Sequence, residues 1–168
     1  MITVSATDLL RVIDATLVSK VEPSLGDVNG RSALATVRHL LNFVRVRIEQ
    51  EGAMLIADDA ALRGLLGQVA EYHRGAGDTG AADDVAAALG AAPTCDATAS
   101  LDDLTGEARV LREALHRALA HLQSLRAERG DDPAYQTIRA AIRAHVVRQI
   151  EAEGELVAPA FFGRGPRR

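Results

Sequence analysis

Residues 104–125 read LTGEARVLREALHRALAHLQSL, and their apolar side chains recur every three or four positions. The recurring positions are Leu104, Ala108, Leu111, Leu115, Ala118, Leu122 and Leu125. This spacing places all of them on one side of an α-helix, because a helix has about 3.6 residues per turn. We call this row the apolar seam. It predicts a long helix that packs against several partner helices.

The same periodicity predicts helices along most of the chain. The expected helices run over residues 8–21 with Thr7 as N-cap, 31–51 with Gly52 as the stop, from about Asp58 through His73, 81–89, 100–130, and from Pro133 to Gly154 or Pro159. Ser100 and Asp103 have the spacing of a capping box, and Asp132 followed by Pro133 is typical of a helix start. We therefore predict an all-α fold, an antiparallel bundle of four to five main helices without a sheet. Residues 1–160 are expected to form one domain, and residues 161–168 a flexible tail.

The composition excludes several classes of protein. The 168 residues are 48% hydrophobic and 25% charged, which is ordinary for a globular domain. A net charge of -4 and an aromatic content of 3% argue against a nucleic-acid partner. The single cysteine, Cys95, excludes an internal disulfide. No apolar run is long enough to cross a membrane, and the N-terminal stretch MITVSATDLL lacks the features of a signal peptide, so we expect a cytoplasmic protein.

One candidate for metal chemistry is Glu113 with His116, because residues three apart share a helix face. Diiron helical bundles use two such pairs, and this chain has one. His145, on the inner side of the last helix, and Glu49 could complete a ligand set. A lone pair supplies too few ligands, so we expect no bound metal or other cofactor, and we interpret Glu113 and His116 as a solvated helix flank.

The remaining candidates are histidines and arginines. His73 ends the apolar stripe of its helix, and His121 lies on a polar flank of the seam helix. Hydrogen-bonded structural roles are the commoner explanation for such histidines, but two histidines that met a carboxylate in one cavity would favour a ligand site. Arg139 and Arg143 are four residues apart and could hold an anionic ligand, although a solvated face is the commoner explanation.

Part of the chain resembles an uncharacterised bacterial family of helical proteins. The resemblance lies in residues 8–12 (DLLRV), 21–25 (VEPSL) and 48–52 (IEQEG), which give a Leu-Leu helix, a proline loop and a long apolar helix. Genes of that family tend to lie beside aminoglycoside-phosphotransferase-like kinases and acyl-CoA dehydrogenases. The resemblance implies a protein partner near acyl-CoA or kinase chemistry. The abundance of Arg and Ala, with Lys20 as the only lysine, is also typical of a bacterial sequence.

The sequence offers many apolar residues on helix surfaces, but few polar residues that are expected to meet in one site. We therefore expect a non-enzymatic accessory or protein-interaction module that self-associates as a homodimer. The alternative is a metal-dependent or small-ligand-binding helical-bundle enzyme with its site between helices.

Overall fold

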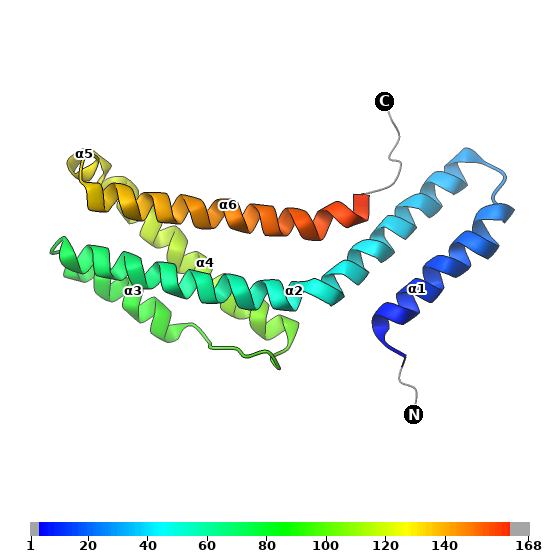
Figure 1. The fold of residues 1–168 in the computed structure, drawn as a ribbon, viewed down its shortest axis with the longest axis horizontal. Coiled ribbons are helices and arrows are strands. Elements are labelled where there is room, and N and C mark those ends of the chain that lie inside the picture. The colour runs from blue at the N-terminus through cyan, green and yellow to red at the C-terminus, as the bar shows by residue number, and fades with distance from the viewer. Residues whose placement is uncertain (1–3, 162–168) are drawn as a thin grey trace. The chain divides into compact units, whose positions relative to one another are not determined.

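The computed structural model describes residues 4–161, and all the regular elements in that range are helices (Figure 1). In chain order they are α1 (Ala6–Thr16), the π-helical turn η1 (Leu17–Val21), the 3-10 turn η2 (Glu22–Ser24), α2 (Val28–Gly75), α3 (Thr79–Ala91), α4 (Leu101–Ser124), α5 (Arg126–Arg129) and α6 (Pro133–Phe161). The all-α prediction is confirmed. Within the described range, no helix is both long enough and apolar enough to cross a membrane.

The chain forms two compact units. Unit 1 contains residues 1–51 and 152–168, and unit 2 contains residues 52–151, so α2 and α6 each contribute to both. The single domain over residues 1–160 stays a prediction, and each unit is described by itself.

The apolar seam is the centre of unit 2. Its first six positions are buried. Leu104 and Ala108 pack with Leu55 of α2, while the next four positions belong to a larger core against which Leu125 packs. The side chains that meet the seam come from three other helices: Leu62, Leu66 and Val69 of α2, Val85 of α3, and Tyr135, Ile138 and Ile142 of α6. The Tyr135 hydroxyl donates a hydrogen bond to the carbonyl of Leu122 at 2.9 Å, so the buried phenol is satisfied. The predicted packing of the seam against partner helices is confirmed.

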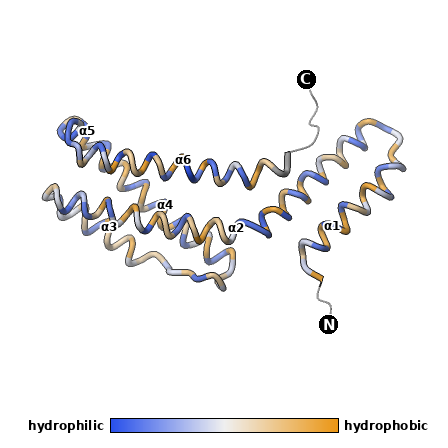
Figure 2. Tube along the Cα trace, in the orientation of Figure 1, coloured by the Kyte–Doolittle hydropathy of each residue, from blue (hydrophilic) through white to orange (hydrophobic). Residues whose placement is uncertain are grey.

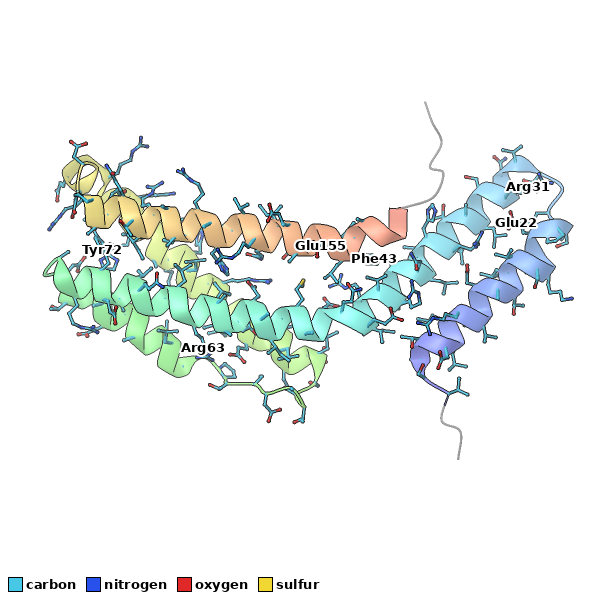
Figure 3. The ribbon with its side chains drawn as sticks, in the orientation of Figure 1. Glu22, Arg31, Phe43, Arg63, Tyr72 and Glu155 are labelled. Atoms are coloured by element: carbon cyan, nitrogen blue, oxygen red, sulfur yellow. The ribbon has the colours of Figure 1, made fainter. Side chains whose placement is uncertain are left out.

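Unit 1 contains a hairpin of α1 and the first part of α2 (Figure 1). Arg11 pairs with Glu49 at 2.8 Å, and Arg38 pairs with Asp14 at 2.8 Å and with Glu22 at 3.7 Å. Residues later in α1 therefore meet residues earlier in α2, which makes the two helices antiparallel. Figure 3 shows Glu22 and Arg31 beside the turn that joins them.

Two predicted helix starts are confirmed in detail. The Ser100 hydroxyl accepts the N–H of Asp103 at 3.2 Å, and the Asp103 carboxylate accepts the N–H of Ser100 at 3.3 Å, which completes a capping box. The carboxylate of Asp132 accepts the N–H of Ala134 at 2.9 Å, and α6 begins at Pro133. Both signals are local, so the tertiary structure does not override them.

Several other boundaries were predicted wrongly. Gly52 does not end a helix, because α2 continues from Val28 to Gly75 and also carries Asp58 in its interior. A glycine ends a helix when its backbone turns left-handed, whereas a helical glycine costs only about 1 kcal/mol, and the helix formers around Gly52 carry the helix through it. The N-cap of α1 is Ser5 and not Thr7, since the Ser5 hydroxyl accepts the N–H of Asp8 at 3.1 Å.

The boundaries in the last third of the chain also differ. α4 ends at Ser124 and the short α5 precedes Gly130, while α6 passes Gly154 and Pro159 and ends at Phe161. A helical Gly154 removes no hydrogen bond from α6, which explains why it fails to stop the helix. The predicted tail over residues 161–168 lies, apart from the backbone of Phe161, outside the described residues.

The end of α2 is set by Gly77, the one described glycine with a positive φ, at 80°. The N–H of Asp78 donates to the carbonyl of His73 at 2.9 Å, and the N–H of Gly77 donates to that of Arg74 at 3.2 Å. These two bonds form a Schellman motif, which needs a residue that accepts the left-handed conformation. The motif turns the chain so that Asp78 lies next to the last turn of α2.

We expect Gly77→Ala to lower the free energy of unfolding by roughly 1–2 kcal/mol, because a Cβ is strained at this φ. Gly67→Ala is the matched control, since Gly67 lies in α2 and a Cβ added there would meet nothing within 4 Å. That control should stabilise the protein by roughly 0.5–1 kcal/mol. Urea denaturation followed by circular dichroism measures both. Equal effects of the two substitutions would contradict the role of Gly77.

Candidate functional site

The structure does not gather the metal candidates taken from the sequence into one site. Glu113 and His116 are exposed on α4, and Glu113 pairs with Arg117 at 3.0 Å. His145 is buried on α6, with 2% of its surface exposed. Glu49, in unit 1, pairs with Arg11 and Arg45. Among the described residues, these candidates form no cluster of three potential metal ligands.

The two candidate arginines have ordinary surroundings. Arg139 donates to the Tyr135 hydroxyl at 3.1 Å, and its guanidinium carbon lies 5.8 Å from the centre of the Tyr135 ring. Arg143 is exposed on α6. A guanidinium stacked on its own helix neighbour has part of its charge satisfied, so this arrangement does not by itself indicate an anion site.

His145 instead belongs to a buried polar group in unit 2. Its Nε2 lies 3.4 Å from the Asp58 carboxylate, which also receives a hydrogen bond from Arg112 at 2.7 Å. Burial lowers the pKa of His145, and the charge of Asp58 opposes this only in part. A neutral His145 therefore lies beside a carboxylate whose charge is already matched by Arg112.

Arg63 and Glu107 form the second part of this polar group. Arg63 donates two hydrogen bonds to one Glu107 oxygen at 2.9 and 2.7 Å, and it also donates to the carbonyls of Ala92 and Pro93. The other Glu107 oxygen accepts the N–H of Cys95 at 2.7 Å. Figure 3 shows Arg63 on the side of α2 that faces the segment following α3. The pair fixes this irregular segment between α3 and α4.

Burial would raise the pKa of Glu107, but the hydrogen bonds from Arg63 and from the Cys95 backbone hold it below its usual value. The neighbouring Asp59 behaves in the opposite way. It is 4% exposed, and neither of its carboxylate oxygens has a hydrogen-bond partner among the described residues. Burial, followed by the charges of Glu107 and Asp58, raises the pKa of Asp59 to about 6. Within the buried polar group, Asp59 is therefore the carboxylate whose ionised form its surroundings disfavour.

We expect Asp59→Asn to stabilise the protein at pH 7.5 by roughly 1–3 kcal/mol. The folded-state pKa of Asp59, about 6, lies above the ordinary value of 3.8, so the folded protein holds this proton more tightly than the unfolded chain. Ionised Asp59 therefore destabilises the fold as the pH rises, and the gain from Asn should shrink as the pH falls from 6 towards 3.8. Denaturant titrations at several pH values test this, with the exposed Asp83→Asn as control. A gain that did not change with pH would contradict the raised pKa.

A second polar group lies where α2 ends and α3 begins. His73 on α2, Asp78 before α3 and His121 on α4 form the one cluster of three potential metal ligands that the described residues contain. The Asp78 Oδ2 atom lies 2.6 Å from Nε2 of His121 and 3.5 Å from Nδ1 of His73. The two imidazole rings are 5.0 Å apart between centroids. The condition under which the sequence would favour a ligand site, two histidines meeting a carboxylate, is therefore present.

These histidines line a cavity of about 580 Å³ between α3 and α4. Its walls are mostly alanine, with Val85 on α3 and Ala118 on α4 among them, and Asp84 and Arg117 add two charged side chains. Small side chains leave space between two helices that larger ones would fill. A mostly apolar cavity with a few polar groups on its wall is the usual form of a small-ligand site.

The sequence contained part of this information. The Gly77–Asp78 dipeptide is a turn signal, and it places a carboxylate directly after the helix that ends near His73. No local pattern could bring in His121, because its approach depends on how α4 packs against α2.

The third feature is an apolar face on the unit 1 hairpin. Asp14 and Arg38 bridge the two helices, and Ile13 and Val37 come directly before them. One residue turns the helix by about 100°, so in antiparallel helices the two preceding rows fall on the same side of the hairpin. The rows are Leu9 and Ile13 on α1, and Val37, Leu40, Val44 and Ile48 on α2. Each of these side chains, which we call the hairpin apolar face, is 45–59% exposed.

No family model matches the chain, and neither a curated protein nor a solved structure matches it.

Proposed function

We propose that the protein is a self-associating interaction module that forms a homodimer through the hairpin apolar face. The observation that carries the proposal is that none of the α1 residues is buried, although α1 is strongly amphipathic. A short helix without a packed apolar face is marginal in water. Figure 2 shows hydrophobic residues recurring among hydrophilic ones along α1 and the first part of α2.

The spacing of the face suits another helical hairpin. Val37, Leu40, Val44 and Ile48 of the face follow a 3-4-4 spacing on α2, which keeps them on one side of the helix. Two copies of an antiparallel hairpin, related by a two-fold axis, would bury their faces against each other as a four-helix bundle. In unit 1 this pattern remains exposed, while in unit 2 the similar seam of α4 is covered by its own helices.

Charge favours a second copy over a strongly charged partner. Residues 4–51 contain six basic and six acidic side chains: Arg11, Lys20, Arg31, Arg38, Arg45 and Arg47, against Asp8, Asp14, Glu22, Asp27, Glu49 and Glu51. Many of them are paired within the hairpin, including Arg45 with Glu49 at 2.9 Å and Arg47 with Glu51. Two neutral hairpins do not repel each other, so apolar contact can decide the association.

Sedimentation velocity at micromolar concentration tests the dimer. We expect the wild type to sediment as a species of twice 17.8 kDa, and the double variant Leu40→Glu, Val44→Glu to sediment as a monomer. Both positions are half exposed in the single chain, so the variant should keep its helical circular dichroism. A buried carboxylate in the dimer is costly, which is why two should prevent association.

Ala35→Glu is the matched control, because Ala35 is exposed on α2 about half a turn away from Val37 and Leu40. It should leave the dimer intact. A wild type that remains at 17.8 kDa, or a control that dissociates as readily as the double variant, would contradict the proposal.

A further inference from the structure

The histidine cluster of unit 2 shares no residue with the hairpin apolar face and takes no part in the proposed self-association. We infer that His73, Asp78 and His121 bind a divalent transition-metal ion, of which Zn²⁺ is the best match, at the wall of the cavity between α3 and α4. Two imidazoles and one carboxylate form a known ligand set for catalytic zinc, and the same set with open positions also binds iron.

The state of His73 is the first support. Its side chain is 1% exposed, and neither ring nitrogen has a hydrogen-bond partner among the described residues. At 3.5 Å from Asp78, its Nδ1 is beyond good hydrogen-bond distance. Buried polar atoms nearly always have a partner, so two unsatisfied nitrogens on one buried ring need an explanation. A metal ion bound to one of them supplies it.

The orientation of Asp78 is the second support. Its Oδ1 accepts the N–H of Ala81 at 3.1 Å and so caps the N-terminus of α3. The Schellman motif at Gly77 holds the backbone of Asp78 against the last turn of α2. Both contacts leave the Oδ2 atom directed to the histidines. The carboxylate is therefore fixed before an ion arrives, as a metal site requires.

The three ligand atoms are close enough together to bind a single ion. The nearest ligand atoms of the three side chains all lie within 4.8 Å of one another. Zinc binds nitrogen and carboxylate oxygen at about 2.0–2.2 Å, so a central ion needs its ligands roughly 3–4 Å apart. The separations from Asp78 Oδ2 to the two histidines, 2.6 and 3.5 Å, lie close to that range.

The protonation states also suit a metal. Burial, followed by the nearby His121, lowers the pKa of His73, so its ring is neutral at neutral pH. The hydrogen bond to His121, together with the N–H of Ala81, lowers the pKa of Asp78. A metal needs neutral imidazole and ionised carboxylate, so both directions favour metal binding.

Three protein ligands leave at least one coordination position for water or a small ligand. Since His73 and His121 line the cavity, that position would be open to its 580 Å³. This set shares no residue with Glu113 and His116, on which the expectation of a metal-free protein was based.

The test is titration of the untagged, full-length protein with Zn²⁺ by isothermal calorimetry, repeated with Co²⁺ and read by its visible absorption. We expect one equivalent to bind and the melting temperature to rise. Asp78→Asn and His121→Gln should each weaken binding at least about tenfold, and Asn keeps the helix cap. His116→Gln on the same helix is the matched control and should bind like the wild type.

His73→Gln is the third variant. Because His73 is buried, this substitution can unfold the protein, and in that case Asp78→Asn and His121→Gln decide the outcome. Helical circular dichroism shows that the variants are folded. The inference is overturned if the wild type does not bind one equivalent of either ion, if the Asp78 and His121 variants bind as tightly as the wild type, or if binding is lost in His116→Gln.

Discussion

The burial of the apolar seam on α4 is the interaction on which unit 2 depends. With an aromatic content of only 3%, the core is built mainly from aliphatic side chains together with Tyr135, and α4 is the element that α2, α3 and α6 all contact. Leu111 and Leu122 have no exposed surface, so the register of α4 cannot slip without opening a cavity. The two polar groups of unit 2 contain residues on either part of this helix, Glu107 near its start and His121 near its end. Their geometry therefore follows from the packing of the seam.

The pair of Arg63 and Glu107 shows how a buried charge can specify structure without adding much stability. Taking both ions out of water is costly, and their attraction repays this only in part. Their additional bonds go to the backbone at Ala92, Pro93 and Cys95, a segment that has few apolar side chains of its own to fix it. The pair thus determines the path of the connection from α3 to α4. Asp59, which lies in the same environment and has no hydrogen bond among the described residues, shows the cost of a carboxylate that lacks such partners.

The parts of the fold that the sequence predicted are those decided locally or by periodicity. The seam, the capping box at Ser100 and the start of α6 at Pro133 needed no knowledge of tertiary structure. The prediction at Gly52 was wrong because glycine is compatible with both a helix end and a helix interior, and only the backbone conformation distinguishes them. In the candidate site, the turn at Gly77 and Asp78 was visible in the sequence, but the approach of His121 depends on packing between α4 and α2. Long-range proximity of this kind has no signature in a single sequence.

Both units contain helices with rows of apolar residues, but these rows are covered in unit 2 and exposed in unit 1. In unit 2 other helices of the same chain cover the apolar seam of α4. Polar side chains beside the seam form defined groups between the helices. In unit 1 the apolar rows of α1 and α2 stay exposed, while the charges are used to hold the hairpin together. A covered core provides the rigid support that a ligand site needs, and an exposed apolar face provides the area that association needs. Because the hairpin apolar face and the histidine cluster share no residue, the proposed association and the proposed metal binding can each be tested by substitutions that leave the other set of side chains unchanged.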